Sequence, residues 1–101
     1  MIDRPSADAG GFTATDAGWI FGGALTLDDA ASIFDACRTL PLPDSGIVDF
    51  GGMLHADSAA LAIIIALKRR AVAEGRTLSA IGLPPTLRSL AVVYGVENLL
   101  E

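Results

Sequence analysis

The stretch from Gly46 to Gly75 constrains the fold more than any other part of this 101-residue chain. It opens with a β-forming run at Ile47–Phe50, passes through a glycine-rich segment at 51–56 that reads as a turn, and continues as strong helix formers over Ala59–Ala73. A second β-forming run follows at Thr77–Ile81. This order predicts a strand, a crossover helix and a parallel strand, which form one βαβ unit.

Both ends of the predicted helix carry sequence signals. Asp57 and Ser58 each suit the N-cap, because their side-chain oxygens can accept from free N–H groups of the first turn. Gly75 is placed to end the helix in a left-handed conformation. The helix boundaries are therefore specified locally.

The chain before this unit predicts a hairpin and a helix. Phe12–Thr15 and Trp19–Phe21 read as short strands around a turn at Asp16–Gly18, and the pair Gly22 and Gly23 is expected to close the second strand. A helix should then begin near Thr26 or Asp28. Its apolar stripe falls at spacings i, i+3, i+4 and i+7, at Ala30, Ile33, Phe34 and Cys37.

A last helix is expected after the βαβ unit. Pro84 or Pro85 suits its first position, and Gly95 its end. The residues expected to be buried along it are Leu87, Leu90, Ala91 and Tyr94. The order ββαβαβα predicts a single α/β domain at residues 12–101, with a mixed four-stranded sheet, and residues 1–11 read as a flexible lead.

Composition excludes several function classes. The net charge of −5 gives no basic field for nucleic acid or for anionic lipid headgroups. The longest apolar run, Ala59–Leu67, covers 9 residues, whereas a membrane-spanning helix needs about 20, so we expect no direct membrane insertion. A single cysteine excludes an internal disulfide. The hydrophobic fraction of 51% suggests that some apolar surface meets a partner.

No catalytic constellation is visible in the sequence. One histidine, His55, and one cysteine, Cys37, cannot be joined into a dyad from sequence, and the glycine pairs match no nucleotide-binding motif. We interpret His55 as a partly exposed turn residue that could instead lie near Ser58, and Cys37 as a packing residue. We expect no enzyme activity, no metal and no cofactor.

Ser58 admits two interpretations. Its hydroxyl can simply cap the helix, which by itself explains the residue type. Alternatively, a hydroxyl displayed at a helix N-terminus is a favourable place for an added phosphate or for a partner. Spacing alone favours the cap and leaves the second possibility open.

The helix at 59–73 carries two apolar stripes, although a helix lying on one sheet needs only one. The first consists of Leu61, Ile64, Ile65, Lys68 and Val72. The second consists of Ala60, Ile63, Leu67 and Ala71. Either the neighbouring helix covers the second stripe or another protein does, and the adjacent basic residues Lys68, Arg69 and Arg70 would suit the polar rim of such an interface.

Several segments together resemble a known family. They are Gly23–Leu27, Ile47–Phe50, Asp57–Leu67, Gly75–Leu78, Gly82–Pro84, Leu87, Leu90–Ala91, Tyr94–Val96 and Leu99–Leu100. In order and spacing they resemble the STAS domains of sulfate transporters and anti-sigma factor antagonists, and within these the MlaB-type subunits of Mla phospholipid-transport ABC complexes. The resemblance covers roughly Gly18 to Leu100 and implies a small sheet with helices mainly on one face.

The resemblance also implies roles for residues. Ser58 matches the Ser or Thr that antagonists have phosphorylated, and in MlaB-type proteins this region faces the ATPase subunit MlaF. Thr26 and Ala60 depart from the acidic residue and the glycine usual in antagonists, and Asp49–Gly51 departs from the usual Asp-Leu-Ser. The first two departures weaken the interpretation of Ser58 as a phosphorylation switch and leave the transporter-subunit interpretation intact. The residues we expect at a partner interface are His55, Asp57, Ser58, Ala59, Ala60, Ile63, Leu67 and Arg70.

Two functions follow from the resemblance. The first is a non-catalytic accessory subunit that binds and stabilises or regulates the ATPase of an MlaFEDB-like complex, cytoplasmic and held at the inner membrane through the permease. The second is an anti-sigma factor antagonist switched by a kinase that phosphorylates Ser58. Neighbouring genes for an ATPase and a permease would favour the first function, and those for a kinase and a sigma factor the second.

Overall fold

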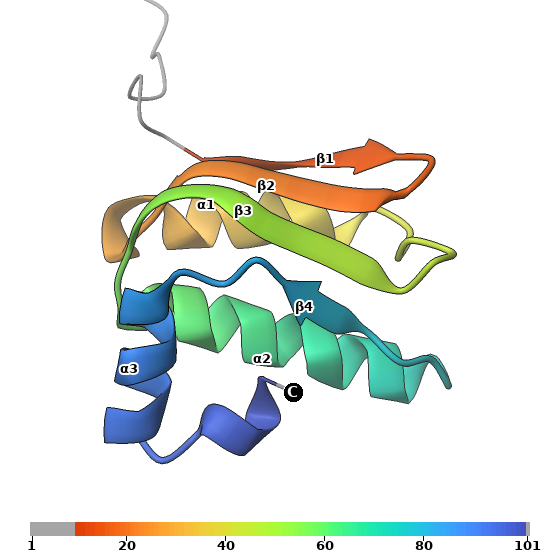
Figure 1. The fold of residues 1–101 in the computed structure, drawn as a ribbon. Helices are drawn as coiled ribbons and strands as arrows, with labels where there is room; N and C mark the ends of the chain where they lie inside the picture. Colours follow the sequence, from red (N-terminus) through yellow and green to blue (C-terminus); the bar gives the residue numbers. More distant parts are fainter. Residues whose placement is uncertain (1–9, 101) are drawn as a thin grey trace, which may run out of the picture.

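The computed structural model describes residues 10–100 and contains a four-stranded sheet, three α-helices and a 3₁₀ turn (Figure 1). Residues 1–9 and 101 lie outside the described part, so most of the predicted N-terminal lead is not placed. The elements in chain order are β1 (Gly11–Thr15), β2 (Gly18–Leu25), α1 (Leu27–Arg38), β3 (Ile47–Ala56), α2 (Ser58–Ala73), β4 (Ser79–Ile81), α3 (Pro85–Val93) and η1 (Glu97–Leu99).

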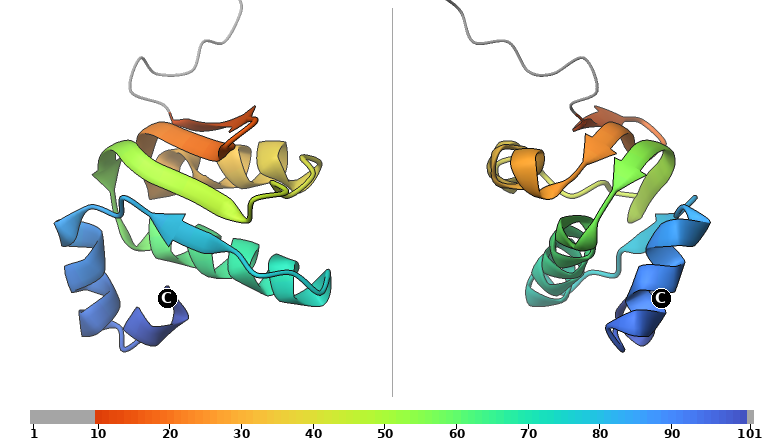
Figure 2. Two further views of the ribbon diagram at one scale, coloured as in Figure 1. Left: turned by 45° about the vertical axis from the view of Figure 1, so that its right-hand side comes forward. Right: turned by 90° about the vertical axis from the view of Figure 1, so that its left-hand side faces the viewer.

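The sheet has the predicted mixed topology. Its strands lie in the order β1-β2-β3-β4, with β1 antiparallel to β2 and the other two pairs parallel. Helices α1 and α2 cover one face of this sheet, and α3 lies beside the β4 edge (Figure 2). The α/β class, the element order and the single STAS-type architecture expected from the sequence are confirmed.

The two glycine pairs lie inside strands, not in turns, so two of our expectations were wrong. Strand β2 continues past Gly22 and Gly23 to Leu25, and β3 continues past Gly52 to Ala56. Gly22 pairs with Gly52 across the two strands, between irregularities in the register. A Cβ atom on Gly52 would lie 2.9 Å from the Phe21 carbonyl oxygen and 3.3 Å from the Gly22 Cα. Glycine is required here because the strands approach closely.

The core is built from the inward faces of the sheet and of α2. Phe12 on β1 packs against the rings of Trp19, Phe21 and Phe50, with centroid distances of 5.4, 5.0 and 6.0 Å. From α2, the buried residues are Ala60, Leu61, Ile63, Ile64, Leu67 and Ala71. Both predicted stripes of this helix therefore contribute to the core of the chain itself.

Glycines end the second and third helices as predicted. Gly75 has φ +71°, the Arg76 N–H donates to the Ala71 carbonyl at 2.7 Å, and the Gly75 N–H donates to Val72 at 2.9 Å. These are the two bonds of a Schellman motif. Gly95 ends α3 with the same pattern, and Val96 folds back against the core.

One residue of the last helix departs from the prediction. Leu87 and Ala91 are buried and Leu90 packs against the core, but Tyr94 is 58% exposed. Helix α3 ends at Val93, so Tyr94 occupies the C-cap, where the backbone is already turning away from the core.

Within residues 10–100, no helix is both long enough and apolar enough to span a membrane.

Candidate functional site

Ser58 lies at the sheet edge where β2 and β3 end. Because α1 and α2 each follow one of two neighbouring parallel strands, their N-termini meet at this carboxyl edge, which is the usual position of binding sites in α/β sheets. Ser58 is the first residue of α2, and its side chain is exposed. Its hydroxyl forms no hydrogen bond with the described residues. The interpretation of Ser58 as the helix cap is therefore wrong, since the N-cap of α2 is Asp57.

Asp57 carries out the capping, and it caps two helices. Its Oδ1 accepts from the Ala59 N–H at 2.8 Å within α2. Its Oδ2 accepts from the Leu27 N–H of α1 at 2.9 Å. Thr26 is the N-cap residue of α1 but supplies no side-chain bond, so α1 is not capped by its own Thr26. One carboxylate at two helix N-termini also lies where the helix dipoles favour negative charge.

His55 is not in a turn, contrary to our expectation. It belongs to β3, where its Cα pairs with that of Ala24 on β2, and its side chain is exposed. The turn was predicted from the glycines at 51 and 52, which instead allow the strand to continue. His55 lies three residues before Ser58, at the same edge of the sheet.

Three of the predicted interface residues lie in the core. Ala60, Ile63 and Leu67 are at most 5% exposed, because the second stripe of α2 is covered by the chain itself. The question of what covers this stripe is thus answered in favour of the chain's own elements. Ala59 is half-buried at the edge between α1 and α2.

Arg70 has a structural role that the sequence did not indicate. Its guanidinium donates to the carbonyl oxygens of Cys37 at 3.2 Å and Leu40 at 2.6 Å, and it pairs with Glu74 at 2.9 Å. The Cys37 and Leu40 carbonyls lie at and just after the C-terminal end of α1, where the Cys37 carbonyl also accepts from the Leu40 N–H at 3.2 Å. Arg70 therefore ties α1 to α2, and its Nε, Nη1 and Nη2 atoms each donate within the chain.

Cys37 is a packing residue, as predicted. It is buried between the helices, and burial raises the pKa of its thiol, although the Arg70 charge and a backbone hydrogen bond act in the opposite direction. A thiol with a raised pKa remains protonated at neutral pH and is a poor nucleophile. Within residues 10–100, no cluster of His, Cys, Asp and Glu could hold a metal ion.

A hollow between α1 and α2 is a candidate site of which the predicted interface residues include only Ala59 and Ile63. It has a volume of about 450 Å³, and all of the described residues that line it are apolar. They are Leu27, Ala30, Ala31, Phe34, Ala59, Ala62, Ile63 and Ala66. We call this hollow the α1–α2 groove. It begins beside Ser58 and Asp57, and Leu27 at its end is 77% exposed.

The sequence does contain a signal for this groove. Its residues fall at i, i+3, i+4 and i+7 on both helices, starting at Leu27 on α1 and at Ala59 on α2. Alanine contributes little to a hydrophobic stripe, and the predicted stripes share only Ala30, Phe34 and Ile63 with the lining of the groove. Small residues on both helices leave an open seam in place of a filled one.

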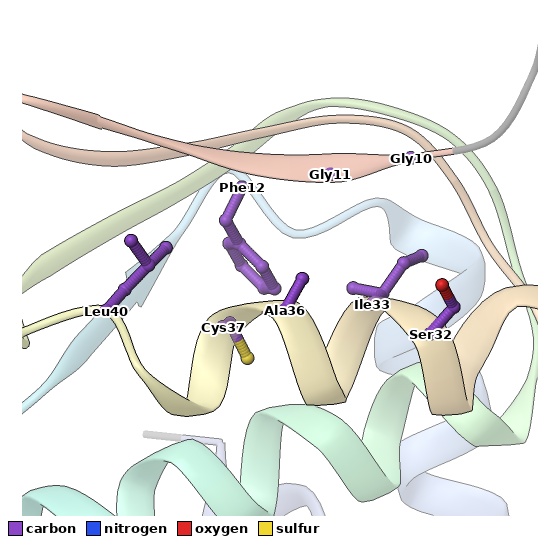
Figure 3. A pocket seen from close by; sticks show the side chains of 8 residues that line it. All are labelled: Gly10, Gly11, Phe12, Ser32, Ile33, Ala36, Cys37 and Leu40. Carbon is purple, nitrogen blue, oxygen red and sulfur yellow. The ribbon is translucent and has the colours of Figure 1, made fainter. Parts of the chain in front are cut away.

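A second hollow, between β1 and α1, has the character of a packing gap. Phe12 points from β1 toward α1, while Ile33 and Ala36 point from α1 toward β1 (Figure 3). Its volume is about 170 Å³, and Gly10 and Gly11 have no side chains to fill it. Among residues 10–100, no charged side chain lines it, so the described lining offers little to a polar ligand.

Comparison with known proteins identifies the fold family. A family model described as "Mlab, STAS domain" matches residues 21–101, which include both helices of the α1–α2 groove and Ser58. No curated protein matches the sequence.

Proposed function

The chain belongs to the MlaB-type STAS domain family, and from this premise we propose that it is a non-catalytic accessory subunit of a phospholipid-transport ABC complex. Its partner is the cytoplasmic ATPase of an MlaFEDB-like assembly, which it binds and stabilises or regulates. The observation that carries the proposal is the α1–α2 groove, whose described lining is apolar and which begins next to the exposed Ser58, whose hydroxyl bonds to none of residues 10–100.

The groove has the properties of a helix-binding surface. Two neighbouring helices each present a stripe at i, i+3, i+4 and i+7, and a third amphipathic helix can pack into such a seam. Ala31, Ala62 and Ala66 keep the seam shallow, so the backbone of a partner helix can approach closely. The exposed Leu27 would be removed from water on docking.

The neighbourhood of the groove supplies polar contacts. Ser58 can donate or accept one hydrogen bond at the end of the seam, and His55 lies at the same edge of the sheet. Asp57 and Arg70 fix the two helices relative to each other and act on docking only through that geometry. Binding through the ATPase and its permease would hold the chain at the cytoplasmic side of the inner membrane.

Co-purification with the cognate ATPase tests this proposal. Wild-type protein should co-purify with the ATPase, and Ser58→Arg should lose most of this association while the isolated domain melts normally. A bulky cation at a close-packed interface must be desolvated without a prepared partner. Normal melting with full co-purification of Ser58→Arg would exclude Ser58 from the interface.

A second function is an anti-sigma factor antagonist, regulated by phosphorylation of Ser58. The exposed and unbonded hydroxyl at a helix N-terminus favours it. The Asp57 carboxylate opposes it, because it already accepts from the helix N–H groups that would stabilise a phosphate. Intact-mass measurement of protein purified from its native cells distinguishes the two functions, since only the antagonist requires a phosphorylated fraction.

A further inference from the structure

A further exposed hollow lies along α2 and is separate both from the α1–α2 groove and from the hollow between β1 and α1. It has a volume of about 360 Å³ and lies between α2 and the 3₁₀ turn η1. Its lining residues are Ile65, Lys68, Arg69, Val72, Asn98 and Leu99. We call it the α2–η1 groove. The described residues that line it include two cations and no anion.

The two grooves occupy different sides of α2. Direction around a helix changes by about 100° per residue, so the stripe of Ile65 and Val72 lies about 120° from the stripe of Ala59 and Ala66. The remaining third of α2 packs on the sheet through Ile64 and its neighbours. The two grooves therefore share no lining residue and open on different sides of the helix.

The floor of the α2–η1 groove is apolar and exposed. Val72 is 75% exposed and Leu99 is 42% exposed, whereas Ile65 is half-buried against the core. Val72 belongs to a stripe that we expected to lie on the sheet, yet the helix turns it outward. Exposed aliphatic side chains that gather in a hollow are typical of sites that bind another apolar surface.

The rim is basic in a chain that is acidic as a whole. Four of the seven basic residues lie on or just after α2, at Lys68, Arg69, Arg70 and Arg76. Arg70 and Arg76 donate to backbone carbonyl oxygens of the chain, Arg76 to those of Leu42 and Pro43. Arg69 is exposed and forms no ion pair with a described residue. Its guanidinium is thus available beside the apolar floor.

We propose that the α2–η1 groove binds an acidic peptide segment of a partner protein whose apolar side chains pack on Ile65, Val72 and Leu99 while its carboxylates pair with Arg69. Guanidinium and carboxylate form charge-assisted, often bidentate hydrogen bonds, which supply specificity beside an apolar contact. An anionic membrane is a poorer occupant, because two lining cations on a chain of net charge −5 give little attraction to a surface.

An unbiased peptide selection tests this proposal. A library of random peptides is selected against the full chain at low salt, and bound peptides are mapped by amide chemical shifts. The expected peptides combine Asp or Glu with large apolar residues, shift the amides of residues 65–72 and 98–99, and bind more weakly as salt increases.

Matched variants sharpen the test. Arg69→Glu should weaken the selected peptides about ten-fold or more, whereas Arg88→Glu, the same charge change at an exposed position on α3, should leave binding within about two-fold. Val72→Ser should weaken binding, and Val93→Ser, at a residue 78% exposed on α3, should not.

Several outcomes overturn the proposal. They are recovery of no binding peptide, recovery of peptides without acidic residues, and mapping to the α1–α2 groove. Binding of anionic vesicles that requires Arg69, with no peptide selected, would make the occupant a membrane. Self-association that Val72→Ser abolishes would make it a second copy. Since this test uses neither Ser58 nor an ATPase, its result is independent of the proposed function.

Discussion

Asp57 shows how one side chain organises the candidate site. Each of its two carboxylate oxygens accepts an N–H from a different helix, so the starts of α1 and α2 are held together and Ser58 is left exposed beside them. We predict that Asp57→Ala destabilises the domain by about 1–3 kcal/mol, because two helix N-termini lose their cap. Ser58→Ala should cost less than about 0.5 kcal/mol. Denaturant melts of both variants measure this, and a larger loss for Ser58→Ala would contradict the assignment of the cap.

The raised pKa of the Cys37 thiol predicts how the stability of the domain depends on pH. Burial raises the pKa of its thiol above the ordinary value of 9.0, so the unfolded chain releases this proton at a lower pH than the folded one. The folded state then binds more protons, and stability should fall as pH rises through 9.0. The stability advantage of the wild type over Cys37→Ala should therefore shrink between about pH 8 and pH 10. A constant or growing advantage in denaturant melts would refute this.

Among the elements, β2 and β3 approach each other so closely that the chain needs glycine at position 52. Gly52→Ala should destabilise the domain by about 1–3 kcal/mol, because the added methyl group meets the backbone of β2 at 2.9 Å. Gly22→Ala is the matched control, since nothing lies within 4 Å of its added carbon. It should be neutral or slightly stabilising, because alanine loses less backbone freedom than glycine on folding. Equal losses of stability in thermal melts would mean that the close approach of β2 is not the reason for glycine at position 52.

The elements also show which features a sequence can predict. The end of α2 was predictable because Gly75 acts on its own neighbours. The continuation of β2 and β3 was not, because a pair of glycines signals a turn locally and a close contact only through its partner strand. Tyr94 matched the helical period, but the helix ends one residue before it.

In the molecule as a whole, α2 borders both of the surfaces that we propose for binding. One side of it packs on the sheet, a second borders the α1–α2 groove and a third borders the α2–η1 groove. The sequence predicted Ser58 and the second stripe of the helix at 59–73 as the partner surface. It did not predict the groove, because alanines give a weak hydrophobic signal and because Ile63 and Leu67 are covered by the chain itself. The partner surface that we propose therefore lies on the same helix as the predicted one but on another side of it.

We propose that the ATPase docks in the α1–α2 groove. Its most direct test is the dissociation constant of the purified chain and its cognate ATPase, measured for Ala62→Arg and Ala73→Arg. Both alanines are exposed on α2, but only Ala62 lines the groove, and Ala73 lies at the far end of the helix. We predict that Ala62→Arg weakens binding about ten-fold or more and that Ala73→Arg changes it less than two-fold, with both domains folded. Unchanged binding by Ala62→Arg, or an equal loss of binding in both variants, would contradict docking of the ATPase in the α1–α2 groove.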